Sequence, residues 1–365
     1  MNKPLLPLEE LFRQRAAARL TELPQMSSDY FAQYQQLLNV FRTQYYPKVD
    51  AGLAANSTEP GLYTAHDSDH FDQVVLYAGE LVNAESSLKR DLTSAASASE
   101  LNAYELYLLL VAIRVHDVGN MYGRDRHEKR CFQILVEIGG AAGLDNREKK
   151  AIANIAQAHG GRTSIQSKDT IGPLDLKLMA NNVSYRPRLL AGIVRIADEI
   201  CENNSRAAIV LLRQSNLPKH SEIYHQYAAS LSGNRWSAND RALHLAFDAK
   251  LSVVEKPWGC EARMDASNSQ VSETYLLDEI FARLEKMDLE RRYCNMFTRE
   301  IFTIDAIKVT IAVVTDDGHD PIETIKVPEL SDRGYPDSRG QGLCGDMKAY
   351  CGPNFGAGLR MKQGV

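Results

Sequence analysis

The feature that most constrains the fold of this chain is a long succession of helical patterns. Between residues 28 and 215, apolar residues recur at spacings of three and four, the period of an amphipathic α-helix. Glycine pairs at 139–140 and 160–161 favour helix ends, and Pro187 suits the first turn of a helix. Since none of these segments alternates as a strand does, we predict a bundle of helices over 30–46, 70–81, 100–116, 128–138, 147–159 and 187–201.

The rest of the chain has a different character. Strand-like alternation or β-branched content marks residues 242–251, 260–265 and 306–314, and residues 271–297 form a long amphipathic pattern. We expect residues 322–327 to pair with 306–314 across the turn at 316–318. The predicted fold is therefore mainly α, with four parts: a lead-in helix and loop over 1–27, a helical domain over 28–215, a smaller C-terminal α+β appendage over 216–330 and a glycine-rich tail over 331–365.

The composition indicates a soluble globular protein. Of the 365 residues, 44% are hydrophobic and 24% are charged, which is ordinary for this class. The formal net charge of -5 argues against a dedicated nucleic-acid binder, which usually carries a basic surplus. We expect no membrane association, because no apolar run reaches about 18 residues and prolines interrupt the short apolar stretch at the N-terminus.

The cysteines indicate a reducing compartment. All six are scattered along the chain without a C-x-x-C pair, so neither a disulfide framework nor a zinc finger is predicted. Cys344 and Cys351 form the closest pair, and the sequence leaves open that they bridge or bind a metal. The tail that contains them lacks periodicity and is expected to be loose or ordered only by a partner. Since the scattered cysteines indicate a reducing compartment, we expect a cytoplasmic protein.

An adjacent histidine and aspartate, His116 and Asp117, end the most apolar of the predicted helices. Neighbouring residues on a helix diverge by about 100°, but near a helix end the backbone can relax and let both side chains face one point. Imidazole with a carboxylate suits iron, manganese, magnesium, cobalt or zinc. The plainer interpretation is that His116 is a C-terminal residue interacting with the helix dipole.

Other histidines and an aspartate surround this pair in the helical half. Each by itself can be explained by a structural role: a capping histidine, a surface histidine, or an aspartate paired with Arg195 three residues earlier. A carboxylate on the otherwise apolar 187–201 segment must be paired, coordinated or protonated, because a lone buried charge is costly. Together with the pair they form one candidate set of metal ligands: His70, His116, Asp117, His127, His159 and Asp198.

The order H…HD…H…H…D across a helical bundle resembles the signature of the HD superfamily. Residues 63–70 resemble the loop that delivers the first ligand histidine, residues 116–120 (His-Asp-Val-Gly-Asn) resemble the HD-[IV]-G element, and residues 195–198 (Arg-Ile-Ala-Asp) resemble the element carrying the final aspartate. The resemblance covers about residues 28–215. In this family two additional histidines between HD and the final aspartate mark members with two metals.

The resemblance therefore implies a binuclear centre of two divalent ions (Mn, Fe, Co, Mg or Zn), with Asp117 as the bridge. His66 precedes His70 by four residues and is an alternative first ligand. Position 120 is asparagine where many members carry lysine, and Arg124 and Arg130 are candidates to replace that positive charge.

The function implied is a metal-dependent phosphohydrolase. Two metals clamp a phosphate and activate water, so we expect hydrolysis of a phosphate ester or anhydride, with a nucleotide as substrate, by a metal-bridging hydroxide. Asp117, Arg124 and Arg195 are the predicted catalytic residues, and Arg162 and Arg206 lie close to the motifs in sequence.

Two alternatives remain at this stage. One is a di-iron oxygenase of a small molecule with the same ligand order, and the other is a nucleotide-binding sensor without catalysis. The expected partner is a small phosphorylated molecule, and the sequence leaves a homo-oligomer open.

Overall fold

The computed structural model describes residues 4–55, 68–123, 126–260, 272–318, 320–332, 342–353, 355–356 and 358–359. Contacts divide the chain into two compact units. The first comprises Met1–Asn56, His66–Cys201 and Arg292–Thr303, and the second comprises Ser57–Ala65, Glu202–Arg291 and Ile304–Val365. The predicted fold class, mainly α with a smaller β part, is confirmed. Whether the four predicted parts are domains stays a prediction.

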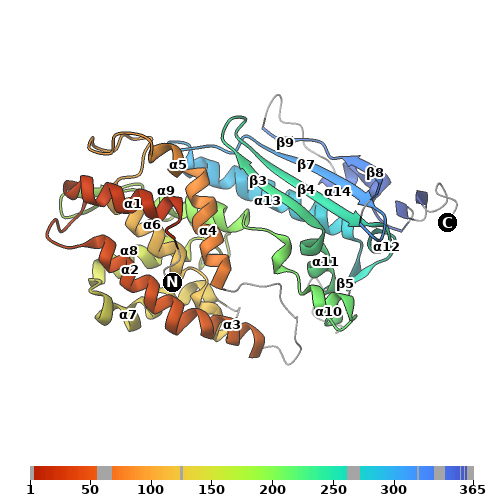
Figure 1. The fold of residues 1–365 in the computed structure, drawn as a ribbon, viewed down its shortest axis with the longest axis horizontal. Coiled ribbons are helices and arrows are strands. Elements are labelled where there is room, and N and C mark those ends of the chain that lie inside the picture. Colours follow the sequence, from red (N-terminus) through yellow and green to blue (C-terminus); the bar gives the residue numbers. More distant parts are fainter. Residues whose placement is uncertain are drawn as a thin grey trace. The chain divides into compact units, whose positions relative to one another are not determined.

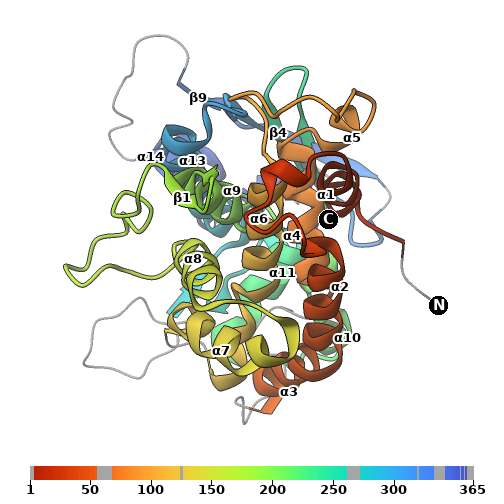
Figure 2. The ribbon, with the colours of Figure 1, turned by 90° about the vertical axis from the view of Figure 1, so that its left-hand side faces the viewer.

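The first unit is a bundle of helices around α6, which is buried along its whole length. Figure 2 shows α6 between α1, α2 and α4 on one side and α8 and α9 on the other. The α-helices are α1 (Pro7–Ala18), α2 (Tyr30–Val40), α3 (Tyr46–Ala55), α4 (Ser68–Leu81), α5 (Ala84–Ser87), α6 (Ala103–Val115), α7 (Cys131–Ala142), α8 (Asn146–Gln157) and α9 (Pro187–Glu199). A π-helical turn, Phe41–Tyr45, joins α2 to α3, and 3-10 helices occupy Leu20–Glu22, Val118–Tyr122 and His127–Arg130.

Capping residues fix where the inner helices begin. The Asn102 side chain accepts a hydrogen bond from the Glu105 backbone N–H at the start of α6, and the Glu105 carboxylate accepts one from the Asn102 N–H. Asp145 and Glu148 repeat this arrangement at α8. Pro187 occupies the first turn of α9, as predicted from its missing N–H.

Two local predictions in this unit were wrong. The helix predicted to end at 138 continues through Gly139 and Gly140 to Ala142, and it ends instead at Gly143, whose φ of +70° is readily adopted by glycine. A short antiparallel hairpin, β1 (Leu178–Ala180) with β2 (Val183–Tyr185), also went unpredicted. Strands of three residues are too short for alternation to show in a sequence.

The second unit is built on a mixed sheet whose strands lie side by side in Figure 1. The order is β3-β4-β7-β8, with β9 also paired to β7. β4 and β7 are parallel, and the other pairs are antiparallel. The strands are β3 (Leu231–Ser237), β4 (Ala242–Lys250), β7 (Ala306–Val314), β8 (Pro321–Lys326) and β9 (Leu330–Ser331). The predicted pairing across the 316–318 turn is confirmed.

Helices and a small hairpin complete this unit. Its helices are α10 (Ile209–Arg213), α11 (Glu222–Ser230), α12 (Leu251–Val254), α14 (Gly342–Asp346) and most of α13 (Leu276–Thr298), with 3-10 turns at Asn204–Arg206, Lys219–Ser221 and Lys348–Tyr350. The predicted helix from 271 begins at Leu276, because Ser272–Thr274 forms β6 and pairs with β5 (Trp258–Cys260). The predicted strand over 260–265 lies mostly outside the described residues. Among the helices that the structure describes, none has the length and apolar character needed to cross a bilayer.

A buried cation, Arg114, ties four helices of the first unit together. It lies on α6 with no exposed surface. Its guanidinium donates to Glu9 on α1 (2.8 Å) and to Asp72 on α4 (2.5 Å). It also donates to the Tyr34 hydroxyl on α2 (3.2 Å), which itself donates to Glu9 (2.5 Å). All of these polar groups would be costly to bury alone, so the network fixes how the four helices meet.

Replacing this cation should therefore destabilise the protein strongly. We expect Arg114→Met to lower the free energy of unfolding by about 3–5 kcal/mol, because it leaves the Glu9 and Asp72 carboxylates without their buried partner. Chemical denaturation followed by circular dichroism measures the loss. Arg13→Met is the matched control, since it breaks an exposed pair with Glu10 on the same bundle and should cost far less. Equal losses in the two variants would contradict the assigned role of Arg114.

Candidate metal centre

All six predicted ligands come together in the first unit. They lie at or near helix ends. His70 lies in the first turn of α4, His116 and Asp117 directly follow α6, and His127 is the first residue of the 3-10 helix His127–Arg130. His159 follows α8, and Asp198 lies near the end of α9. Two overlapping groups of donor atoms lie within 4.8 Å of one another, His70 with His116 and Asp198, and His116 with Asp117 and His159. His127 joins them through Asp117, at 2.9 Å.

Asp117 divides its two carboxylate oxygens between two pairs of histidines. Oδ2 lies 3.9 Å from Nε2 of His70 and 3.8 Å from Nε2 of His116. Oδ1 lies 2.9 Å from Nε2 of His127 and 3.4 Å from Nε2 of His159. Asp198 adds a second carboxylate to the first pair, with Oδ1 at 3.3 Å from His70 and 3.6 Å from His116. Asp117 thus lies between two adjacent pairs of histidines, with one oxygen facing each pair.

Backbone carbonyls orient two of the imidazoles. Nδ1 of His116 lies 2.7 Å from the carbonyl oxygen of Ile113, and Nδ1 of His159 lies 2.6 Å from that of Ala156. In both cases the carbonyl belongs to the third residue before the histidine, at the C-terminal end of a helix where carbonyls lack intrahelical partners. With Nδ1 protonated and donating, the lone pair of Nε2 points into the cluster.

The end of α6 explains how His116 and Asp117 face one point. α6 stops at Val115, and Asp117 adopts φ -105° and ψ 2°, outside the helical region, before a 3-10 helix begins. Gly119 then passes so close to His127 that an added Cβ would lie 2.1 Å from the His127 carbonyl oxygen. Only glycine permits this approach, which brings His127 beside Asp117.

The electrostatics of the cluster fit a bound cation. Nε2 of His116 is buried and has no hydrogen-bond partner among the described residues, although two carboxylates lie within 4 Å. Burial by itself lowers the pKa of His116, but Asp117 and Asp198 outweigh burial and raise that pKa to about 9. Burial raises the pKa of the Asp117 carboxyl, but His116, His127 and His159 bring it well below its usual range. A proton on His116 thus holds the place that a metal ion would take.

The candidate ligands differ in exposure. The side chains of His70 and His116 are 3% and 0% exposed, whereas those of His127 and Asp198 are 20% and 26% exposed. His127 and Asp198 are therefore the ligands most open to a small molecule.

Other residues near the cluster were not foreseen. Sγ of Cys201 lies 3.6 Å from Nδ1 of His70, the ring nitrogen that faces away from the carboxylates. The buried Glu128 carboxylate lies 3.8 Å from Nδ1 of His127. Adjacency to a candidate ligand was the available signal for Glu128. Cys201 looked in the sequence like a small apolar core residue, since nothing along the chain links it to His70.

The predicted arginines are less closely tied to the cluster. Arg195 is buried, donates to the Lys168 carbonyl (3.1 Å) and the Thr170 hydroxyl (2.8 Å), and lies over the Tyr293 ring, so it supports the 168–170 segment. A catalytic role for Arg195 stays a prediction.

The remaining predicted side chains are placed as follows. Arg124 and the alternative ligand His66 lie outside the described residues. Arg162 donates to the Gln166 carbonyl, and Arg206, in the second unit, pairs with Glu202. Asn120 is buried, and its amide has no hydrogen-bond partner among the described residues.

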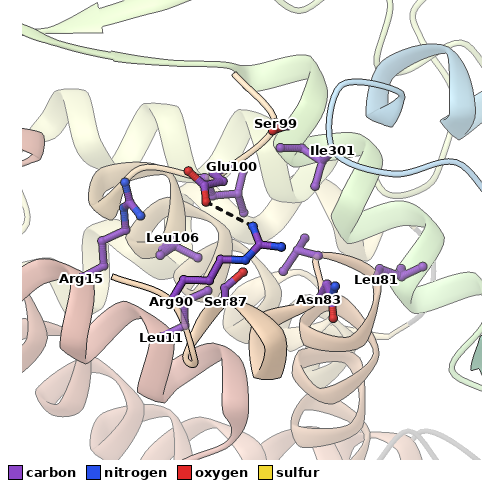
Figure 3. A pocket seen from close by; sticks show the side chains of 12 residues that line it. Leu11, Arg15, Leu81, Asn83, Ser87, Arg90, Ser99, Glu100, Leu106 and Ile301 are labelled. Atoms are coloured by element: carbon purple, nitrogen blue, oxygen red, sulfur yellow. Dashed lines mark ion pairs between the residues drawn. The ribbon is translucent and has the colours of Figure 1, made fainter. Parts of the chain in front are cut away.

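Two hollows in the first unit lie apart from the cluster. One, of about 230 Å³, lies between α1, the end of α4 and the 99–101 segment (Figure 3). Figure 3 shows Arg90 pointing toward Glu100, at 3.7 Å, and Arg15 pairs with Glu22 at 2.9 Å. Because both arginines lining this hollow are already paired, it is a poor phosphate site.

The second hollow, of about 690 Å³, is lined by residues that begin α6 and α9, among them Asn102, Glu105 and Arg186. His116 and Asp198 lie at the other ends of these helices, roughly 20 Å away at 1.5 Å per residue.

Comparison with known proteins gives one family. No curated protein and no solved structure matches the chain significantly. The model of the HD-CE family matches residues 60–286, more than half of the chain. The match therefore begins later than the 28–215 resemblance and extends into the second unit as far as α13. With this match and a His/Asp cluster compatible with an HD-type metal site, the chain belongs to the HD-CE family.

Proposed function

We propose that this HD-CE protein is a metal-dependent phosphohydrolase that acts on a phosphate ester or anhydride, with a nucleotide as its expected substrate. The observation that carries the proposal is the division of the Asp117 oxygens between two pairs of histidines. Two divalent cations held there would act as Lewis acids on a phosphate and lower the pKa of a water molecule. HD domains are generally hydrolases, which agrees with this chemistry.

The residues of the chain would hold and orient the reacting groups. His70, His116 and Asp198 form one donor set, His127 and His159 form the other, and Asp117 joins them. The two carboxylates contribute two negative charges, so two divalent cations would leave the centre positive and attractive to a phosphate anion. A phosphate would reach the centre past His127 or Asp198, the two most exposed of the six ligands. We keep Arg124 and Arg195 as proposed contacts of the transition state.

Removing the bridge should abolish both metal binding and turnover. We expect Asp117→Ala to purify with fewer than the roughly two metal ions per chain proposed for the wild type, because both donor sets lose a ligand. Metal analysis, and a screen of phosphate esters and nucleotides with Mn²⁺, Co²⁺, Mg²⁺ and Fe²⁺, measure the two effects. Asp240→Ala, which removes a carboxylate paired with Lys308 in the second unit, is the control and should keep both.

Full turnover by Asp117→Ala would refute the proposal. Two irons with a mixed-valence signal and no phosphate release would instead identify an oxygenase. Nucleotide binding with bound metal and no turnover of any substrate would identify a sensor.

Substituting the close-packed glycine should weaken one donor set selectively. Since a Cβ at Gly119 would displace the His127 backbone, we expect Gly119→Ala to lower metal affinity by about 10- to 100-fold at the His127 and His159 side, with the other side retained. Native mass spectrometry across a metal titration should show one ion where the wild type shows two. Gly160→Ala is the matched control, because no atom lies within 4 Å of its added Cβ. Equal binding by Gly119→Ala and the wild type would show that this contact does not position His127.

Metal uptake should depend on pH. In the metal-free protein the pKa of His116 is raised to about 9, so at neutral pH this imidazole carries a proton that a metal ion must displace. Apparent metal affinity should therefore rise about tenfold per pH unit from 7 toward 9 and level off above that. Competition with a chelator whose own protonation is known measures the slope. Affinity independent of pH across this range would show that His116 is neutral before the metal binds, or is not a ligand.

A further inference from the structure

A second group of metal-binding side chains lies in the second unit, in the segment that the sequence suggested was loose. Asp278 lies in the first turn of α13, Cys344 lies within α14, and Cys351 directly follows the Lys348–Tyr350 turn. One ligand atom of each lies within 4.8 Å of the other two, and all three residues are half-buried. Residues separated by more than 60 positions in the chain thus meet at one point.

Several contacts hold the segment around the two cysteines against α13. Leu343 is fully buried, and its backbone N–H donates to the carboxylate of Glu285, which lies seven residues after Asp278 on α13. The Gly352 N–H donates to Oδ2 of Asp278 at 3.4 Å, and Sγ of Cys344 lies 3.8 Å from the Asp278 carbonyl oxygen. Because backbone and side-chain contacts both position this segment, the two thiols are aimed at the carboxylate by the fold.

From this geometry we infer that Asp278, Cys344 and Cys351 bind a divalent cation of the zinc class. Thiolate sulfur is the donor that selects zinc and similar soft metals, and a carboxylate oxygen is a common companion ligand. A tetrahedral zinc ion with Zn–S near 2.3 Å separates its donor atoms by roughly 3.5–3.8 Å, so small side-chain rotations would close the observed group around an ion. Three protein ligands leave the fourth position to water.

The charges of the group favour a cation over a disulfide. A disulfide between Cys344 and Cys351 would leave the Asp278 carboxylate facing sulfur, whereas a divalent cation would contact all three ligands and offset two of their three negative charges. The bound ion would fasten the 342–352 segment to α13, a role separate from the His/Asp cluster.

Cobalt substitution tests this site independently of hydrolysis. The six ligands proposed for the His/Asp cluster include no cysteine, so a thiolate-to-cobalt charge-transfer band in the near ultraviolet reports on the cysteines alone. Full-length protein, purified with reductant and stripped of metal, is titrated with Co²⁺. We expect a band whose final intensity corresponds to one thiolate-bound ion per chain, which persists in Asp117→Ala and disappears in Cys344→Ser and Cys351→Ser.

Two further variants guard against loss by unfolding. Cys260→Ser removes another half-buried cysteine of the second unit, outside the group, and should keep the band. Asp278→Asn keeps both thiols and should retain the band with weaker cobalt affinity. The inference is overturned by absence of a charge-transfer band, by its survival in both Cys344→Ser and Cys351→Ser, or by peptide mapping that finds a Cys344–Cys351 disulfide in protein freshly purified with its thiols blocked.

Discussion

The first unit depends on the burial of one positive charge. Arg114 lies two residues before His116 on α6, and its partner Asp72 lies two residues after His70 on α4. The same two helices therefore carry a buried ion pair and two candidate metal ligands. Since leaving either charge unpaired costs several kcal/mol, the pair fixes the positions of α4 and α6 along each other. The separation of His70 from His116 follows from that constraint, and Glu9 on α1 pairs with the same arginine.

Helix ends are the second feature of the fold that brings the metal-binding side chains together. His116 and His159 each follow a helix, and Nδ1 of each contacts the carbonyl oxygen three residues earlier. This contact gives a carbonyl at the helix end a hydrogen-bond partner and directs Nε2 toward the cluster. The negative end of the helix dipole also favours a cation nearby. Asp117 can join both sides only because α6 stops at Val115. The centre is therefore assembled from the ends of regular helices, with Gly119 allowing the close approach of His127.

In the second unit, we propose that a metal ion fastens a chain segment to α13. β4 and β7 are parallel neighbours, so the chain must cross over between them, and α13 lies in that connection. The segment from Gly342 then returns to the start of α13, where two cysteines face Asp278. This segment has three glycines in eleven residues and buries Leu343 and Met347, and a bound ion would add to the stability that this burial supplies. The HD-CE match ends within α13, before this segment.

The sequence alone predicted the helices α2, α4, α6, α7, α8, α9 and α13, the strand β7 with its β8 partner, and the six candidate ligands, whereas α3 and the short helices of the second unit were not predicted. Those features depend on periodicity, caps and residue types, which act over a few positions along the chain. Only the tertiary structure decided which Asp117 oxygen faces which histidines, that His127 reaches Asp117 past Gly119, and that Cys201 lies against His70. It also decided that Cys344 and Cys351 meet Asp278. These are contacts between residues far apart in the chain, and they are set by how buried charges and side-chain volumes are accommodated together, which no local pattern encodes.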